Sequence, residues 1–269
     1  MNTFMGDKIM SDYAANGYVV VKGQFQEREL EKVRAVLQDF HEAWQQKNAA
    51  FYAEKAVNSA YLTGTEYLGE AGRNVLFHFI GSSRLMDIAA SVIKGRPTFM
   101  NTQLFFDPVN KAQKNYWHRD PQYHLSVGEQ KEALSGPDVV HFRVPLVDEP
   151  GIELIPGTHR RWDSDEELAV RLERSGRKNY DNLPGGIKVA LAAGDLLVFS
   201  ANMIHRGLYG TDRLSLDVLL CGPEPGLIKY ARDDCLPCRE VLSSLENPVA
   251  FESTIAIKNK EQAIAAPSR

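Results

Sequence analysis

The sequence predicts an α+β protein with a double-stranded β-helix, or jelly roll, and N-terminal helices packed on one of its sheets. Apolar residues recur at helical spacing in the first third of the chain, and short apolar segments separated by turn residues follow from Thr98 onward. Helices followed by many short strands indicate this class and a closed antiparallel β part. At 269 residues and 43% hydrophobic content, the chain can form one domain with a sizeable core.

We expect one domain over residues 1–269. Within it, residues 1–97 provide largely helical support with an opening strand, 98–221 form the jelly-roll core, and 222–269 form a C-terminal extension. Helices are expected at 10–16, 27–47 and 82–94, and Gly17 is a suitable C-terminal cap for the first. The β-branched segment 18–22 predicts the opening strand. Residues 48–73 predict mixed helix and loop.

The second half of the chain carries the strand pattern. Strands are expected at 98–106, 139–146, 152–155, 187–191, 196–200 and 213–221. The acidic segment 163–173 predicts a helix that acts as a lid or an insert. The polar, alanine-rich residues 258–269 are expected to fray.

Composition excludes several classes of protein. The net charge is −4, the pI is about 6.0 and no long basic run occurs, so a nucleic-acid partner is not expected. The sequence shows neither an apolar stretch long enough to span a bilayer nor a signal-peptide core, which predicts a cytoplasmic protein without a membrane partner. The three cysteines, Cys221, Cys235 and Cys238, offer too few ligands for a zinc site, and we expect them to be reduced.

The segment Tyr116–Pro121 places a histidine and an aspartate two residues apart. If it is extended, His118 and Asp120 point to one face, and Arg119 points away. Pro121 favours extended geometry at the residue before it. His205, far along the chain, supplies a second imidazole. Two imidazoles and one carboxylate on one face are the ligand set of non-haem Fe(II) oxygenases.

Four stretches occur in a characteristic order: His118-x-Asp120, Gly151–His159, Ala193–Phe199 leading into His205, and Arg213-Leu214-Ser215. In these stretches the chain resembles the phytanoyl-CoA dioxygenase family of Fe(II)- and 2-oxoglutarate-dependent oxygenases. Residues 16–23 are similar to the opening strand of that family. The resemblance covers the core half of the chain and supports the jelly-roll prediction.

The resemblance implies an enzyme that uses Fe(II), 2-oxoglutarate and O2. His118, Asp120 and His205 would bind the metal. The expected reaction hydroxylates a C–H bond of a small organic molecule and releases succinate and CO2. Related halogenases lack the carboxylate ligand, so the presence of Asp120 favours oxygen transfer. Desaturation or ring closure would use the same cofactors, and a non-catalytic jelly-roll protein that binds a small ligand or a metal is the alternative from another class.

The distal carboxylate of 2-oxoglutarate requires a cation, and the planar fork of arginine suits it. Arg213 and Ser215 share one strand face, and we predict that they bind this carboxylate. The alternative is a surface Arg213 paired with Asp212 or Asp217. Arg206 is a competing candidate, but as the neighbour of His205 it would face the opposite side of a strand.

Two further residues are candidates for the cavity wall. Gln103 is expected to line the co-substrate pocket, and a structural hydrogen bond explains it equally well. Arg143 would bind an acidic substrate group or the co-substrate, although an ion pair with Glu153 or Asp148 is an alternative.

The other histidines are not expected to bind metal. His124 is interpreted as a pocket or loop residue, and His159, next to Arg160 and Arg161, is expected at the surface. His41 and His78 are interpreted as packing or surface residues. The sequence leaves the substrate and the oligomeric state open.

Overall fold

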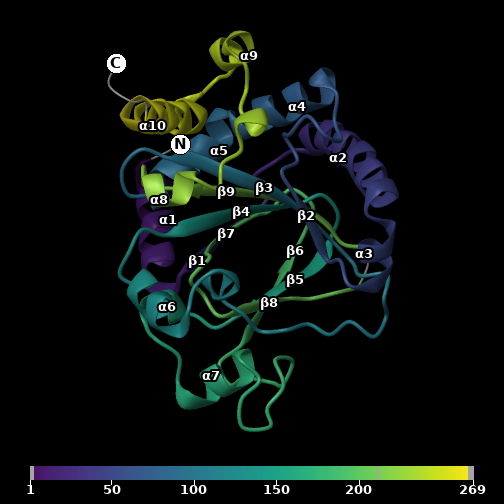
Figure 1. Ribbon diagram of the computed structural model, residues 1–269, viewed down its shortest axis with the longest axis vertical. Helices are drawn as coiled ribbons and strands as arrows, with labels where there is room; N and C mark the ends of the chain where they lie inside the picture. Colours follow the sequence, from purple (N-terminus) through teal and green to yellow (C-terminus); the bar gives the residue numbers. More distant parts are fainter. Residues whose placement is uncertain (1–2, 211, 266–269) are drawn as a thin grey trace.

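The computed structural model describes residues 3–210 and 212–265, and its strands form two antiparallel sheets (Figure 1). The larger sheet has six strands in the order β1-β7-β4-β9-β3-β2. Their bounds are β1 Tyr18–Val21, β7 Leu196–Ser200, β4 Val139–Pro145, β9 Leu214–Cys221, β3 Thr98–Phe106 and β2 Asn58–Ala60. The opening strand β1 therefore pairs with β7, so the N-terminal part of the chain adds an edge strand to this sheet next to a strand from the second half of the chain.

The smaller sheet has the order β6-β5-β8, with β6 Ile187–Leu191, β5 Glu149–Leu154 and β8 His205–Gly207. Apolar side chains from both sheets, including Leu154, Leu197 and Phe199, form one buried cluster. A break in register in β5 lies between Glu149 and Ile152. Gly151 makes this bulge possible, because it has a φ of +77° and a Cβ there would lie 1.8 Å from the carbonyl oxygen of Val189.

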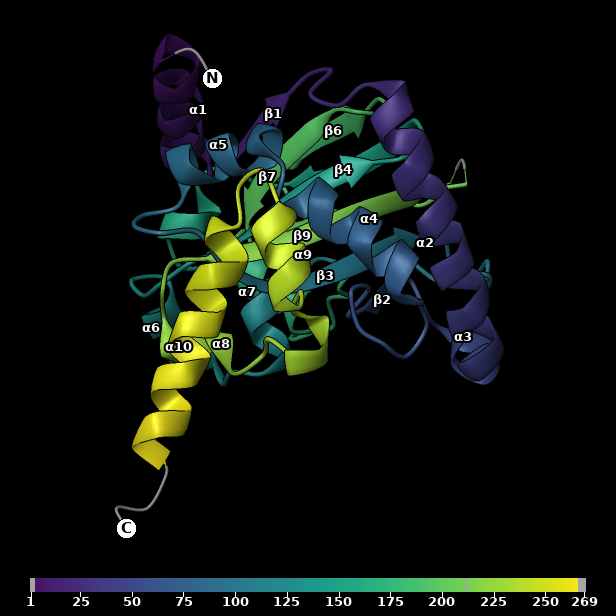
Figure 2. The ribbon, with the colours of Figure 1, turned by 90° about the horizontal axis from the view of Figure 1, so that it is seen from above.

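Helices cover the outer face of the larger sheet (Figure 2). The covering helices are α2 Glu27–Lys47, α4 Glu70–Ile80, α5 Ser83–Val92, α9 Arg239–Ser244 and α10 Val249–Ala265. The remaining helices are α1 Thr3–Asn16, α3 Ala49–Glu54, α6 Val127–Ala133, α7 Asp165–Arg171 and α8 Pro225–Ile228, with short 3-10 turns η1 Asp120–Tyr123, η2 Thr158–Arg160 and η3 Asp233–Cys235. The main hydrophobic core lies between this helical layer and the sheet.

Helix α2 shows how the pattern produces this layer. Its buried residues, Leu30, Val33, Leu37, Phe40 and Trp44, follow helical spacing and face the core. At its start, the backbone N–H of Gln26 donates to the Glu29 carboxylate at 2.9 Å, which satisfies a backbone donor that the first turn leaves free.

The predicted fold class is confirmed. Each predicted strand is present, although β5 begins earlier than expected, at Glu149, because of its bulge. The helix predicted at 82–94 is α5, and the acidic segment forms α7. Within the mixed segment 48–73 the structure has α3 and β2, and β2 was not predicted.

The prediction that residues 258–269 fray is wrong over the described part, since α10 continues to Ala265; residues 266–269 lie outside the described ranges. Helix α10 packs on β3, where the Thr254 hydroxyl donates to the Phe99 carbonyl at 2.6 Å and the rings of Phe99 and Phe251 are 4.8 Å apart. In the described ranges no single helix is long and apolar enough to cross a membrane. Only α4 and α5 together, bent by 49°, reach that length and composition.

Candidate metal centre and cavity

The structure brings the three predicted metal ligands together. His118, Asp120 and His205 each offer one ligand atom, and these atoms lie within 4.8 Å of one another. The backbones of His118 and His205 form an isolated antiparallel bridge with N–H···O distances of 2.9 and 3.0 Å. This bridge joins the loop after β3 to strand β8, and it holds the two imidazoles side by side with their ring centroids 4.2 Å apart.

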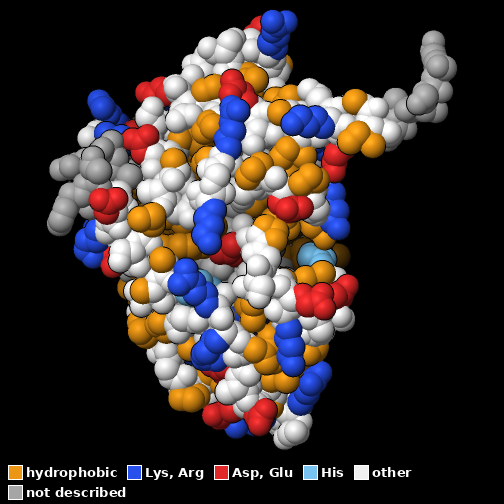
Figure 3. Space-filling model, turned by 90° about the vertical axis from the view of Figure 1, so that its left-hand side faces the viewer, with side chains coloured by type: hydrophobic (Ala, Val, Ile, Leu, Met, Phe, Trp, Pro, Cys, Tyr) orange, Lys and Arg blue, Asp and Glu red, His pale blue; other side chains and the backbone are white. Residues whose placement is uncertain are grey.

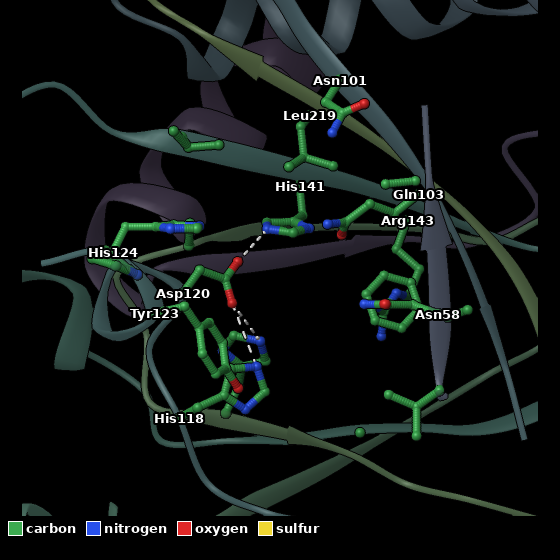
Figure 4. A pocket seen from close by; sticks show the side chains of 18 of the residues that line it. Asn58, Asn101, Gln103, His118, Asp120, Tyr123, His124, His141, Arg143 and Leu219 are labelled. Atoms are coloured by element: carbon green, nitrogen blue, oxygen red, sulfur yellow. Dashed lines mark hydrogen bonds and ion pairs between the residues drawn. The ribbon is translucent and has the colours of Figure 1, made fainter. Parts of the chain in front are cut away.

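The two imidazole rings are oriented in the same way. Nδ1 of His118 lies 3.1 Å from the Tyr116 carbonyl, and Nδ1 of His205 lies 3.1 Å from the Met203 carbonyl. Each Nε2 therefore faces Asp120 Oδ1, at 3.4 Å from His118 and 3.7 Å from His205 (Figure 4). Burial, with the neighbouring His118, lowers the pKa of His205 to about 3, so this ring is neutral, the form that binds a metal.

In the segment Tyr116–Pro121, side-chain direction alternates as predicted as far as Asp120. Arg119 has extended backbone angles, with φ −115° and ψ 139°, and the chain then turns into η1 at Asp120 with Pro121 in its first turn. Arg119 points away from the ligands into the protein and is 1% exposed. It donates to Asp163 and to the carbonyl groups of Thr158, Asn202 and Arg161.

A chain of charges extends from Asp120 into the larger sheet. The second carboxylate oxygen of Asp120 lies 2.7 Å from His141 Nε2, and His141 Nδ1 lies 2.9 Å from Asp217. Arg143 donates twice to the same Asp217, at 2.7 and 2.8 Å. Burial opposes ionisation in these groups, but the two carboxylates raise the pKa of His141 to about 9, and Arg143 and His141 lower the pKa of Asp217 to about 2.

Sequence reasoning gave no role to His141 and considered Asp217 only as an alternative partner of Arg213. One signal was available in the sequence. His141 and Arg143 are two residues apart on β4, so their side chains face the same side of the strand. The suggested partners of Arg143, Glu153 and Asp148, are wrong. The ladder between β4 and β9 places Arg143 directly opposite Asp217. Glu153 pairs with Arg206 instead. The sequence predicts that Arg206 faces the side of its strand opposite to His205.

Arg213 also has an unexpected partner. Its Nε lies 3.2 Å from Glu149 Oε2, and the Ser215 hydroxyl donates to the same oxygen at 2.5 Å. The alternative partners considered from the sequence, Asp212 and Asp217, are therefore wrong. Arg213 is 3% exposed and lines the cavity, and its Nη2 and Glu149 Oε1 are buried without a hydrogen-bond partner. Arg213 thus lines the cavity and keeps one buried guanidinium nitrogen without a hydrogen-bond partner.

The metal ligands and Arg213 belong to the wall of one cavity of about 840 Å³. Gln103, on β3, and Arg143 lie across it from the triad (Figure 4), whereas Ser215 is fully buried behind Glu149. His124 lines the cavity, which agrees with its interpretation as a pocket residue. Aromatic residues that the sequence did not single out for a role, Tyr116 and Tyr123, flank His118 with ring centroids 5.2 and 5.6 Å away.

The prediction that His159 lies at the surface is wrong, because its side chain is only 7% exposed. It packs against Gly17, where a Cβ would lie 2.5 Å from its Nδ1. The prediction was based on the hydrophilic neighbours Arg160 and Arg161, which do not determine the burial of His159. His41, by contrast, packs against Phe106 and Trp44, and His78 is exposed, as expected.

Solved structures with the same fold bind the expected groups. SnoN from nogalamycin biosynthesis, in complex with Fe3+, alpha ketoglutarate and nogalamycin RO, is 17% identical, with 82% of this chain and 85% of that chain covered and a TM-score of 0.53. HygX from Streptomyces hygroscopicus, with nickel and 2-oxoglutarate bound, is 15% identical over 80% and 86% of the chains, with a TM-score of 0.57. EctD from S. alaskensis with bound Fe is 15% identical over 83% and 77%, with a TM-score of 0.55.

A comparison with curated protein sequences gives no match. A family model described as phytanoyl-CoA dioxygenase matches residues 13–209, a range that contains all three metal ligands and ends before Arg213. This match covers most of the chain and agrees with the two-sheet architecture and the His-Asp-His triad. The chain belongs to the phytanoyl-CoA dioxygenase family.

Proposed function

We propose that the protein is an Fe(II)- and 2-oxoglutarate-dependent oxygenase that hydroxylates a C–H bond of a small organic molecule. The observation that carries this proposal is the meeting of His118, Asp120 and His205 in a cavity that Arg213 also lines. The family match and the Fe- and 2-oxoglutarate-bound structures of similar fold support it.

The donor set fits ferrous iron. Two imidazole nitrogens and one carboxylate oxygen lie close together, and both rings are fixed through their other nitrogen. His141 holds the second oxygen of Asp120, which leaves the first oxygen for the metal. The rings of Tyr116 and Tyr123 pack beside the His118 ring.

The cavity also fits a dicarboxylate. The Arg213 side chain lines the cavity, its Nη2 has no hydrogen-bond partner, and Glu149 holds the guanidinium through Nε. We propose that this group binds the distal carboxylate of 2-oxoglutarate, with Gln103 on the same wall. The proposed role of Ser215 is indirect in this geometry, because its hydroxyl donates to Glu149. Iron and 2-oxoglutarate, when bound, supply the oxidising power, and the protein positions the substrate and limits side reactions.

Hydroxylation is the reaction we favour, since Asp120 occupies the ligand position that halogenases leave open. Similar structures include proteins described as an epimerase, SnoN, and a carbocyclase, SnoK, so product analysis decides between outcomes. We also propose a small-molecule substrate and neither nucleic-acid nor membrane partners, and a cytoplasmic location remains a prediction. On the face in Figure 3, Lys and Arg side chains are spread out with Asp and Glu side chains among them.

The direct test is succinate release from 2-oxoglutarate after addition of Fe(II) and O2. We expect substrate-independent turnover that is lost in His205→Ala, together with loss of tight Fe(II) binding measured by calorimetry under anaerobic conditions. His78→Ala, at an exposed histidine outside the cavity, is the matched control. If wild-type protein binds neither Fe(II) nor 2-oxoglutarate, the oxygenase proposal fails.

A further inference from the structure

Two of the large hydrophobic side chains that remain exposed in the described ranges lie inside the cavity. Tyr123 is 53% exposed and Phe51 is 43% exposed, and both line its wall. Tyr123 stands beside the metal ligands (Figure 4), with its ring 5.6 Å from that of His118. An aromatic face left uncovered within a concave site is a surface on which a ligand ring can stack.

Neutral hydrogen-bonding groups make up most of the polar lining. Five tyrosines line the cavity: Tyr61, Tyr116, Tyr123, Tyr209 and Tyr230. The ordinary pKa of a tyrosine phenol is about 10, so these groups are uncharged near neutral pH. Amide side chains, among them Asn58, Asn101 and Gln113, add donors and acceptors on the same wall.

The charged side chains of the lining are paired within the protein or are assigned here to the metal or to 2-oxoglutarate. Among the described lining residues, the only carboxylate is Asp120, a metal ligand. Arg143 and Arg213 are paired with the buried carboxylates of Asp217 and Glu149. Lys55 is the remaining lysine or arginine of the lining, and its side chain is 59% exposed and lies 3.9 Å from Glu54. A charged substrate group next to the metal would be desolvated without a free counter-ion, which is costly.

We propose that the substrate is an uncharged ring compound that carries several hydroxyl or carbonyl oxygens, and that its ring stacks on Tyr123 beside the metal. This inference rests on the proposed function of the same cavity. The aromatic faces bind the ring, and the phenols and amides bind its oxygens. Tyr123 is thereby a specificity-determining residue, since it combines an exposed face with proximity to His118.

Matched compounds test the charge class. The probes are neutral hydroxylated ring compounds paired with their acids, for example p-nitrophenyl β-glucoside with p-nitrophenyl β-glucuronide, and hexanoyl-CoA as an acyl thioester. Binding is measured by ligand-observed NMR on the anaerobic protein with Fe(II) and 2-oxoglutarate. We expect neutral members to bind about tenfold or more tightly than their acids. Equal or tighter binding of the acids or of the thioester overturns the proposal, as does the absence of any neutral ligand at about 1 mM.

Substitutions test whether the ring of the ligand stacks on Tyr123. Tyr123→Leu is expected to weaken binding of the best neutral compound about five- to tenfold, and Tyr123→Phe is expected to retain most of it, because the face is preserved. The matched control is Tyr180→Leu, since Tyr180 is 44% exposed and does not line the cavity. Wild-type affinity in Tyr123→Leu rejects the stacking site.

Two separate readouts distinguish this inference from the proposed function. If a neutral ring compound binds but no 2-oxoglutarate is consumed with any probe, the oxygenase proposal fails and the ligand class stands. If 2-oxoglutarate is consumed and only charged probes stimulate it, the oxygenase proposal stands and the ligand class is wrong.

Discussion

Two buried charge clusters lie on either side of the metal ligands, and they differ in how completely their polar atoms are used. Behind the ligands, Asp163 lies between Arg119 and Arg171, with N···O distances of 2.7 and 2.6 Å. The guanidinium nitrogens of both arginines donate hydrogen bonds within the protein. Arg119 also donates to backbone carbonyl groups, and Arg171 also donates to Gln122 and Gln130. At the cavity wall, Arg213 and Glu149 form one ion pair and each retains a buried atom without a partner.

The difference indicates different roles. A buried network whose donors and acceptors are all satisfied fixes the structure and offers nothing to a ligand. A buried donor without a partner is costly unless another molecule supplies the acceptor. We therefore interpret the Arg119–Asp163–Arg171 cluster as a support for the metal-binding loop and the Arg213–Glu149 cluster as part of a binding site.

The largest effect on stability is expected at Asp163. Asp163→Ala leaves two buried guanidinium groups without their carboxylate, and it should lower the free energy of unfolding by about 3–5 kcal/mol, measured by urea denaturation. Asp165→Ala, at an exposed aspartate in the first turn of α7, should cost about 0.5 kcal/mol. A loss below about 1 kcal/mol at Asp163 would show that this cluster is not structural.

The second prediction separates binding from stability at the other cluster. Arg213→Met leaves Glu149 buried and unpaired, and it should destabilise the protein by about 3 kcal/mol, whereas the double variant Arg213→Met/Glu149→Met should regain much of this. Both variants should bind 2-oxoglutarate about 100-fold more weakly, because the charge-assisted hydrogen bonds are absent. Calorimetric titration with 2-oxoglutarate under anaerobic conditions provides the measurement. Wild-type affinity in the double variant would remove Arg213 from the binding site.

A third, smaller effect is expected at His141, which links the two regions by bridging Asp120 to Asp217. In His141→Gln the amide cannot bridge both carboxylates, so Asp120 is less firmly oriented. Fe(II) affinity should fall by about 10- to 100-fold. His78→Gln is the control at an exposed site. Unchanged Fe(II) affinity in His141→Gln would mean that the backbone alone positions Asp120.

The smallest effect concerns pH and lies outside both clusters. Burial lowers the pKa of His159 to about 4, and both of its ring nitrogens are buried without a partner. The unfolded chain takes up a proton near the ordinary pKa of about 6.5 and the folded chain does not. This contribution to stability is therefore complete above pH 6.5 and is lost as pH falls toward 4.

From about pH 7 to about pH 5 the loss should be on the order of 1 kcal/mol. In His159→Phe, which keeps an aromatic ring at the site, the fall in unfolding free energy between these two pH values should be smaller by that amount. An unchanged pH dependence would assign the acid sensitivity to other groups, of which His41 is the first candidate, since burial also lowers its pKa to about 4.

Much of the fold could be predicted because its signals are local. Helix α2 carries its apolar stripe within one continuous segment, and β7 and β9 are short apolar runs bounded by turns. Helix α10 was not predicted, and its packing on β3 depends on a strand far away in the sequence. Strand β2 has three residues, too few to show a period.

The sequence alone was enough to predict which residues bind the metal and to which side of the chain their side chains point. Alternation over two residues separates Asp120 and His118 from Arg119, and it separates His205 from Arg206, because side-chain direction in an extended chain depends only on neighbouring backbone angles. Only the tertiary structure decided the partners of the buried charges. Arg143 meets Asp217 through the register of β4 with β9, and Arg213 meets Glu149 across the two sheets. These pairings depend on how distant strands align, which no local pattern encodes.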